Sequence, residues 1–195
     1  MDTSRCSSVT TFAVVAAPVL IALYGGIRLL DGSREPGPGW LVGHGLMLLG
    51  LLLFGPVLAA LGRGRGVWGR AVAGVAFAGL AASLGQIGID LYVGAVAVDK
   101  ADQHRLFDGI QSRPGVLPAF YSVGPLLFHV GLLALLVLAA AGAGRVLRWW
   151  SPVLVLAGTV LTAADLAFVP VAAGCYLVAL APLGGFGAAA RPAAV

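Results

Sequence analysis

Charged side chains are scarce in this sequence. Only 10% of its 195 residues are Asp, Glu, Lys or Arg, whereas 59% are hydrophobic and the mean hydropathy is +0.98. A soluble domain is about 25% charged, so this chain has too few polar side chains to cover a globule in water. The composition therefore predicts lipid as the solvent and argues against a soluble protein.

Cysteine and the familiar catalytic motifs are also nearly absent. The two cysteines, Cys6 and Cys175, have no metal-type spacing, and we expect them near opposite sides of a membrane, which argues against a disulfide. The basic turn GRGRG (62–66) lacks the GxxxxGK[ST] pattern of a phosphate-binding loop, and neither HExxH nor GxSxG occurs. We therefore expect neither a metal nor a cofactor.

The positive charge of the chain does not indicate nucleic-acid binding. The net charge is +4 and the pI is near 9.6, but the arginines stand in short clusters between apolar runs. That distribution is typical of a membrane protein whose cytoplasmic loops are basic. We therefore expect no nucleic-acid partner.

The apolar runs predict an all-α, polytopic transmembrane helix bundle that forms one domain over residues 1–195. Each run is near the ~20 residues that cross a bilayer as a helix. Because the runs are continuously apolar, they favour helices over a barrel, whose strands alternate. Five spans are the alternative if residues 151–187 do not divide in two. The six expected spans are 9–30, 40–62, 71–98, 115–142, 151–167 and 168–187. Leu106, Phe107 and Ile110 predict a further short surface helix between the third and fourth spans.

Lys and Arg predict that both termini lie inside the cell. In that orientation the inner segments hold seven basic residues: Arg5, Arg63, Arg65, Arg70, Arg145, Arg148 and Arg191. The outer segments hold five: Arg28, Arg34, Lys100, Arg105 and Arg113. Acidic residues in the outer loops reduce the charge there further. We therefore expect a multi-pass protein of the cytoplasmic membrane.

One carboxylate, Asp90, lies inside the third expected span, in SLGQIGIDLYVGAV (83–96). A charged side chain inside a membrane is costly and by default marks a functional site. Gln86 lies four residues before Asp90 and Ser83 three residues before Gln86, so the helical repeat predicts that all three share a face.

Other polar residues also fall in the outer half of the expected spans, at about 1.5 Å per residue. Ser122 and His129 are seven residues apart and are expected on one face, as are Thr162 and Asp165. We therefore infer a polar-lined cavity that opens toward the outer leaflet. The remaining members of this group are His44, Tyr121, Cys175 and Tyr176.

Structural roles explain several of these residues as well. Asp165 could lie in a solvated turn, His129 could bond to a backbone carbonyl, and Asp90 could pair with Arg28 or Tyr121. A haem shared by His44 and His129 is not expected, because the two differ in height by roughly 15 Å at 1.5 Å per residue.

The polar residues favour acid-initiated chemistry on an apolar substrate. A carboxyl in a low-dielectric site has a raised pKa and can hold a proton at neutral pH, as a general acid must. Aromatic faces would stabilise a cationic intermediate. The expected substrate-binding residues are Gln86, Tyr92, Tyr121, Tyr176 and Trp40.

Isolated acids in GQIGIDLYVG (85–94) and GTVLTAADLAF (158–168), in a small multi-span chain rich in Ala, Gly, Leu and Arg, resemble the membrane-bound terpene cyclases. The resemblance implies an enzyme of the isomerase or lyase type that protonates an alkene or epoxide of an isoprenoid or prenylated substrate. It implies Asp90 as proton donor, Asp165 as second acid and His129 as base. GHGLMLLG (43–50) with GIDLYVG (88–94) equally resembles uncharacterised actinobacterial multi-span proteins.

Two other functions fit the same residues. An intramembrane Asp near a His could relay protons in a small proton-coupled transporter, which would need a homo-oligomer. An immunity or accessory membrane protein is the other alternative. For the enzyme, the expected partners are membrane lipid and an apolar, isoprenoid or lipid-like small molecule, with a homo-oligomer as a further expectation.

Overall fold

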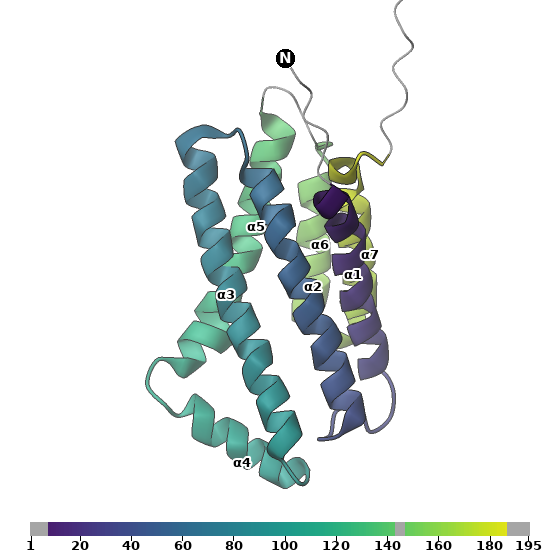
Figure 1. Cartoon of the computed structure of the whole chain (residues 1–195), viewed down its shortest axis with the longest axis vertical. Helices are drawn as coiled ribbons and strands as arrows, with labels where there is room; N and C mark the ends of the chain where they lie inside the picture. The colour runs from purple at the N-terminus through teal and green to yellow at the C-terminus, as the bar shows by residue number, and fades with distance from the viewer. Residues whose placement is uncertain (1–7, 143–146, 187–195) are drawn as a thin grey trace, which may run out of the picture.

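The computed structural model describes residues 8–142 and 147–186, and every regular element in these residues is helical (Figure 1). The all-α prediction is therefore confirmed. The α-helices are α1 Ser8–Arg28, α2 Pro38–Gly62, α3 Gly66–Val96, α4 Lys100–Gln111, α5 Val123–Ala141, α6 Ser151–Ala164 and α7 Val169–Leu180. Three short elements complete the fold: the π-helix η1 Leu117–Ser122 and the 3-10 helices η2 Leu166–Phe168 and η3 Ala181–Gly184.

Five helical stretches are long and apolar enough to cross a membrane: Ser8–Arg28, Pro38–Gly62, Gly66–Val96, Leu117–Ala141 and Leu166–Gly184. The chain is therefore a multi-pass membrane protein. The sixth apolar helix, α6, has 14 residues, so it is about 21 Å long against a hydrocarbon core of about 30 Å. It packs against α7. The structure thus agrees with the expected six or five spans.

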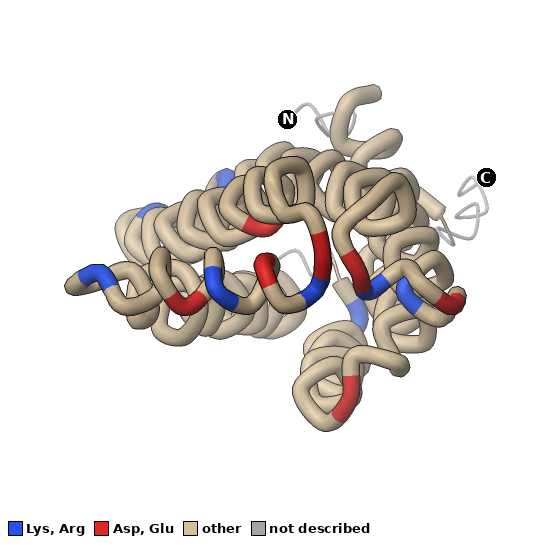
Figure 2. The backbone as a smooth tube through the Cα atoms, turned by 90° about the horizontal axis from the view of Figure 1, so that it is seen from below, with Lys and Arg blue, Asp and Glu red and all other residues tan. Residues whose placement is uncertain are grey.

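The bundle has two chemically different ends. At one end, which we call the N-terminal end, α1 begins and packs on η3, and the turn between α2 and α3 lies there too (Figure 1). The opposite end, which we call the α4 end, displays Lys, Arg, Asp and Glu on α4 and the neighbouring loops (Figure 2). This division matches the expected loop charges, but Arg5, Arg145 and Arg191, like Cys6, lie outside the described residues. Which end faces the cytoplasm stays a prediction.

Helices α3 and α5 pack closely because glycines face the partner helix. A Cβ atom at Gly79 would lie 2.0 Å from the backbone nitrogen of Phe128, and one at Gly131 would lie 2.7 Å from Ala76. Small residues permit such approach between helices in a membrane. This contact fixes α5, with His129 on it, against α3.

The fourth span begins with an irregular turn. In η1 the helix widens, and the N–H of Val123 donates to the carbonyl of Pro118, five residues earlier. Pro125 has no N–H, so it cannot donate to the carbonyl of Tyr121 as an α-helix would require. Ser122 is exposed and does not share a buried face with His129. That expectation assumed an unbroken α-helix, and the π turn changes the rotation of residues ahead of Val123.

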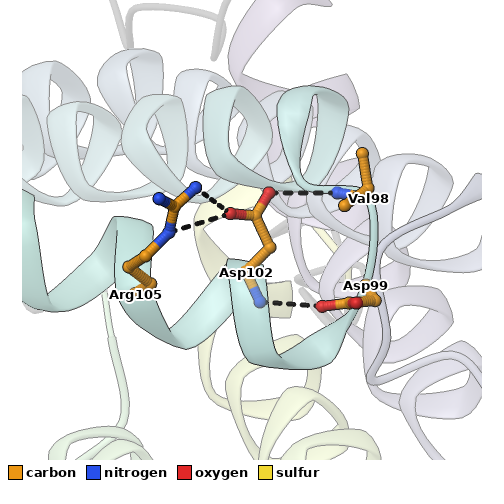
Figure 3. Close-up of polar contacts among 4 residues, drawn as sticks. All are labelled: Val98, Asp99, Asp102 and Arg105. Carbon is orange, nitrogen blue, oxygen red and sulfur yellow. Dashed lines mark hydrogen bonds and ion pairs between the residues drawn. The ribbon is translucent and has the colours of Figure 1, made fainter.

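The expected short surface helix is α4. Its Leu106, Phe107 and Ile110 are half-buried, and the helix crosses the end of the bundle (Figure 1). Asp99 caps it, because its carboxylate accepts the Asp102 N–H at 2.8 Å. Figure 3 shows the Asp102 carboxylate accepting in turn from Val98 N–H, at 3.2 Å, and from Arg105.

We expect Gly79→Ala to lower the free energy of unfolding by about 1–3 kcal/mol, because the added methyl group forces α3 and α5 apart. Thermal unfolding in detergent measures the effect. Gly74→Ala is the matched control, since Gly74 lies on the same helix with nothing within 4 Å of the added atom. Equal stability of the two variants would contradict the close contact.

We expect the first turn of α4 to fray in acid. The hydrogen bond from Arg105, with that from the Val98 N–H, lowers the pKa of the Asp102 carboxyl. Because this pKa is lower in the folded state than in the unfolded state, the ionised carboxylate stabilises α4 at any pH above the ordinary Asp pKa. The stabilisation is lost as the pH falls through the pKa of the folded state. Hydrogen exchange at the Val98 amide, corrected for intrinsic rates, should accelerate in this range. Asp102→Asn should abolish the pH dependence. If Asp102→Asn showed the same pH dependence as the parent, the Asp102 carboxyl would not be its cause.

Candidate functional site

A cavity of about 200 Å³ lies among α1, α2, α3, α5, α6 and α7. Its wall is mostly apolar and includes the rings of Phe54 and Phe128. The polar residues that line it are Tyr24, Ser83, Gln86, Asp90, His129, Thr162 and Tyr176. Asp90 is the only carboxylate among the lining residues that the structure describes. The structure therefore brings together Asp90, Gln86, His129 and Tyr176, four of the residues expected from the sequence.

Asp90 is buried, with 7% of its surface exposed. Its Oδ1 accepts a hydrogen bond from the Tyr121 hydroxyl at 3.2 Å. Arg28 interacts electrostatically with Asp90, but in the described part of the chain the only ion pair within 4 Å joins Arg105 and Asp102. Of the two partners considered from the sequence, Tyr121 bonds directly to Asp90 and Arg28 does not.

The backbone of Asp90 is held from α2. The indole Nε1 of Trp40 donates to the Asp90 carbonyl oxygen at 2.7 Å. The indole fits there because Gly94 has no side chain, since a Cβ atom at this position would lie only 2.1 Å from the indole. His44 stacks on the same indole, with ring centroids 4.1 Å apart. Trp40 therefore positions Asp90 and does not line the cavity.

His129 lines the cavity and keeps one ring nitrogen free of the backbone. Its Nδ1 lies 2.9 Å from the carbonyl oxygen of Pro125. A carbonyl can only accept, so Nδ1 carries the hydrogen and a neutral ring keeps its lone pair on Nε2. The backbone bond considered from the sequence therefore exists. It leaves Nε2 as the basic atom on a side chain that lines the cavity.

Three aromatic rings form one wall of the cavity. Phe54 contacts Phe128 and Tyr176 edge to face, with centroids 5.4 and 6.1 Å apart. The Tyr176 hydroxyl lies 2.7 Å from Thr159 Oγ1, which donates to the Val155 carbonyl at 2.8 Å. The single Thr159 hydrogen is thus used, so Tyr176 donates to Thr159. This bond fixes the Tyr176 ring against the cavity.

Four of the expected residues do not line the cavity. Trp40 and Tyr121 bond to Asp90 instead, whereas Asp165 and Tyr92 lie away from it. Asp165 is exposed, and its carboxylate accepts the Ala167 N–H at 2.8 Å to cap η2. It does not continue the face of Thr162 because α6 ends at Ala164. Tyr92 is 58% exposed. It lies two residues beyond Asp90, so the helical repeat turns it to a different face.

Phe54 and Tyr24 line the cavity although the sequence did not single them out as site residues. A phenylalanine in a continuously apolar span has no pattern that separates a cavity wall from ordinary packing. Tyr24 lies four residues before Arg28 at the end of the first span, and this placement equally fits an interfacial tyrosine. Neither residue carried a signal strong enough to assign it.

Comparison with known protein families, with curated proteins and with solved structures finds no match. The resemblance to membrane-bound terpene cyclases therefore stays a prediction. What this cavity can do follows from its own residues: a carboxyl, an imidazole nitrogen and aromatic faces in a largely apolar space.

We expect Gly94→Ala to destabilise the protein by about 1–3 kcal/mol, because the new methyl group collides with the Trp40 indole. A double-mutant cycle in detergent identifies the cause. In a Trp40→Ala background the same change should cost little, since the indole is gone. Gly88→Ala, at an open position on α3, is the control. An equal cost with and without the indole would contradict the assignment.

Proposed function

We propose that this chain is a membrane enzyme that cyclises an isoprenoid or prenylated substrate, and that Asp90 starts the reaction by protonating it. The observation that carries this proposal is the single carboxyl, Asp90, in a cavity that is otherwise mostly apolar. Protonation of an alkene needs an acid that is shielded from bulk water, and a mostly apolar cavity supplies such a setting. The same setting keeps water from capturing the cation.

The bonding of Asp90 indicates which oxygen donates the proton. The Tyr121 hydroxyl donates to Oδ1, so a neutral Asp90 carries its own hydrogen on Oδ2. Transfer of this proton to one carbon of the substrate alkene leaves the cation on the other carbon. The electron pair of a second alkene then closes the ring. Tyr121 stabilises the resulting carboxylate through the bond that it already makes.

The last step needs a base, and His129 supplies one. Nε2 is the free nitrogen of a neutral ring whose Nδ1 is bonded to Pro125. It would take a proton from the carbon beside the cation, which forms the product alkene. Phe54, Phe128 and Tyr176 offer π faces to the cation between these steps. One proton enters from Asp90 and one leaves to His129, so no oxidant or cofactor is needed.

The cavity suits the reacting part of an isoprenoid. Its volume of about 200 Å³ exceeds that of an engineered apolar cavity of about 150 Å³ that binds benzene. A single ring fits this space, and a longer tail would extend between helices into lipid. We propose that the bilayer is that of the cytoplasmic membrane. An apolar substrate would enter the cavity laterally from this bilayer, so Asp90 need not face the side on which the substrate is made.

Proton-coupled transport is the second candidate. One observation favours it: Asp90 lines both the internal cavity and a surface hollow at the α4 end. A transported ion or solute would also need a path to the N-terminal end. There the fully buried Leu58, Leu61, Leu132 and Leu135 fill the bundle. This closed, apolar half favours the enzyme.

Conversion of a panel of linear isoprenoids and prenylated aromatics by membranes that contain the protein tests the proposal. We expect cyclic product from the parent and a loss of at least about 100-fold in Asp90→Asn, which has no acidic proton to give. Asp165→Asn is the matched control, and because Asp165 is exposed it should keep parental activity. His129→Gln should slow the reaction or change the product mixture.

Each outcome of this panel has a distinct meaning. Product from Asp90→Asn at the parental rate would remove Asp90 from the role of donor. Loss of activity in Asp165→Asn at equal membrane levels would give that residue the second-acid role that the sequence suggested. If no panel member reacts with the folded parent, while proteoliposomes show Asp90-dependent proton flux, transport replaces cyclisation.

A further inference from the structure

Asp90 lies between two separate spaces. It lines the internal cavity and also a surface hollow of about 450 Å³ at the α4 end. The other residues of this hollow are His104, Phe107, Asp108, Gln111 and Tyr121. We propose that the hollow is a proton-uptake site, in which His104 and Asp108 exchange protons with water and Tyr121 passes them to Asp90. This inference rests on the proposed role of Asp90 as a proton donor.

A proton donor inside a membrane must be reloaded after every turnover. The described residues of the N-terminal half of the bundle pack as an apolar cluster, and they offer Asp90 no polar route to water. The hollow at the α4 end does, because Asp90 forms part of its lining. The aqueous side of Asp90 and its substrate side are therefore different, and protons can arrive without water filling the cavity.

Tyr121 is the group that connects the hollow to the carboxyl. Its hydroxyl donates to Asp90 Oδ1 at 3.2 Å, and its side chain lines the hollow. In the transfer, the Tyr121 O–H bond breaks as an O–H bond forms on Asp90 Oδ1, and rotation about the Asp90 Cβ–Cγ bond then turns the protonated oxygen toward the cavity. The Tyr121 oxygen takes a replacement proton from water in the hollow at the same time. Tyrosine is unchanged at the end, and one proton has moved inward.

Helix α4 supplies the groups that collect protons. His104 and Asp108 are four residues apart, so they lie on one face of α4, and both are exposed at the hollow. Histidine is a common proton shuttle in proteins, and the Asp108 carboxylate lies one helical turn away from His104. Phe107, between them in sequence, contacts Trp40 with ring centroids 6.2 Å apart. This contact ties α4 to the side chain that holds the Asp90 backbone.

Titratable and charged groups approach Asp90 and its hollow from several elements. They are Tyr24 and Arg28 of α1, His44 of α2, His104 and Asp108 of α4, Tyr121 of η1 and His129 of α5. Only Tyr121 bonds directly to the carboxyl. Replacing its hydroxyl therefore breaks the relay and leaves the other charges in place.

Infrared spectroscopy of the full chain in nanodiscs tests the relay without any substrate. After a rapid drop in pH, the C=O band of the protonated Asp90 carboxyl grows, and Asp90→Asn identifies this band by removing it. We expect Tyr121→Phe to slow its growth by about tenfold or more, because the transferable hydroxyl proton is gone. Tyr92→Phe, an exposed tyrosine on α3, should match the parent. An unchanged rate in Tyr121→Phe would overturn the relay.

A second pair of variants tests the collecting groups and avoids the buried site. The double variant His104→Gln with Asp108→Asn should also slow the growth of the C=O band. Asp102→Asn should not, because Asp102 lies on the same helix but pairs with Arg105 and does not line the hollow. Equal rates in these two proteins would remove α4 from the proposal. Because the infrared rate needs no substrate, failure of the relay proposal and failure of the cyclisation proposal are distinguishable. The first shows as an unchanged infrared rate in Tyr121→Phe, and the second as no cyclic product from the substrate panel.

Discussion

A carboxyl inside an apolar bundle is the constraint on which the rest of this structure depends. Moving a charge away from water is costly, and a carboxyl in such a place persists only where it is bonded or neutral. Asp90 has one side-chain bond, from Tyr121, and one backbone bond, from Trp40. These come from η1 and α2, so two neighbouring elements must be placed correctly before Asp90 is stabilised.

The irregular features of the fold serve this placement. Gly94 leaves room for the Trp40 indole, and Gly79 and Gly131 let α5 approach α3. The π turn of η1 lies where the fourth span comes closest to Asp90, and such turns are frequent at functional sites. Each feature departs from an ideal or bulkier helix locally: Gly94 admits the Trp40 donor to the Asp90 carbonyl oxygen, and η1 carries the Tyr121 donor to the Asp90 carboxyl. Several departures from ideal helix geometry around one residue are expected at a functional site.

The sequence predicted the bundle well because its signal is composition over long runs. Continuous apolar stretches of about 20 residues allow few structures in lipid, and the shared face of Ser83, Gln86 and Asp90 follows from the helical repeat alone. Asp165 was harder to place, because the end of α6 at Ala164 depends on local backbone geometry. Ser122 was misplaced for the same reason: periodicity assumes an unbroken α-helix, and a π turn leaves no clear mark in composition.

The two halves of the bundle differ in a way that bears on function. Toward the N-terminal end the buried side chains of the described residues are mostly Leu, Val and Ala, with Thr10 and Ser151 as buried polar residues, whereas Asp90 and His44, two buried ionisable side chains, lie toward the α4 end. A transporter must open its site to both sides, which is expensive where one side is densely packed. An enzyme with a membrane-soluble substrate needs only lipid access and a source of protons. The asymmetry of this bundle suits the second requirement, because apolar packing isolates the cavity on one side and Asp90 borders a polar hollow on the other.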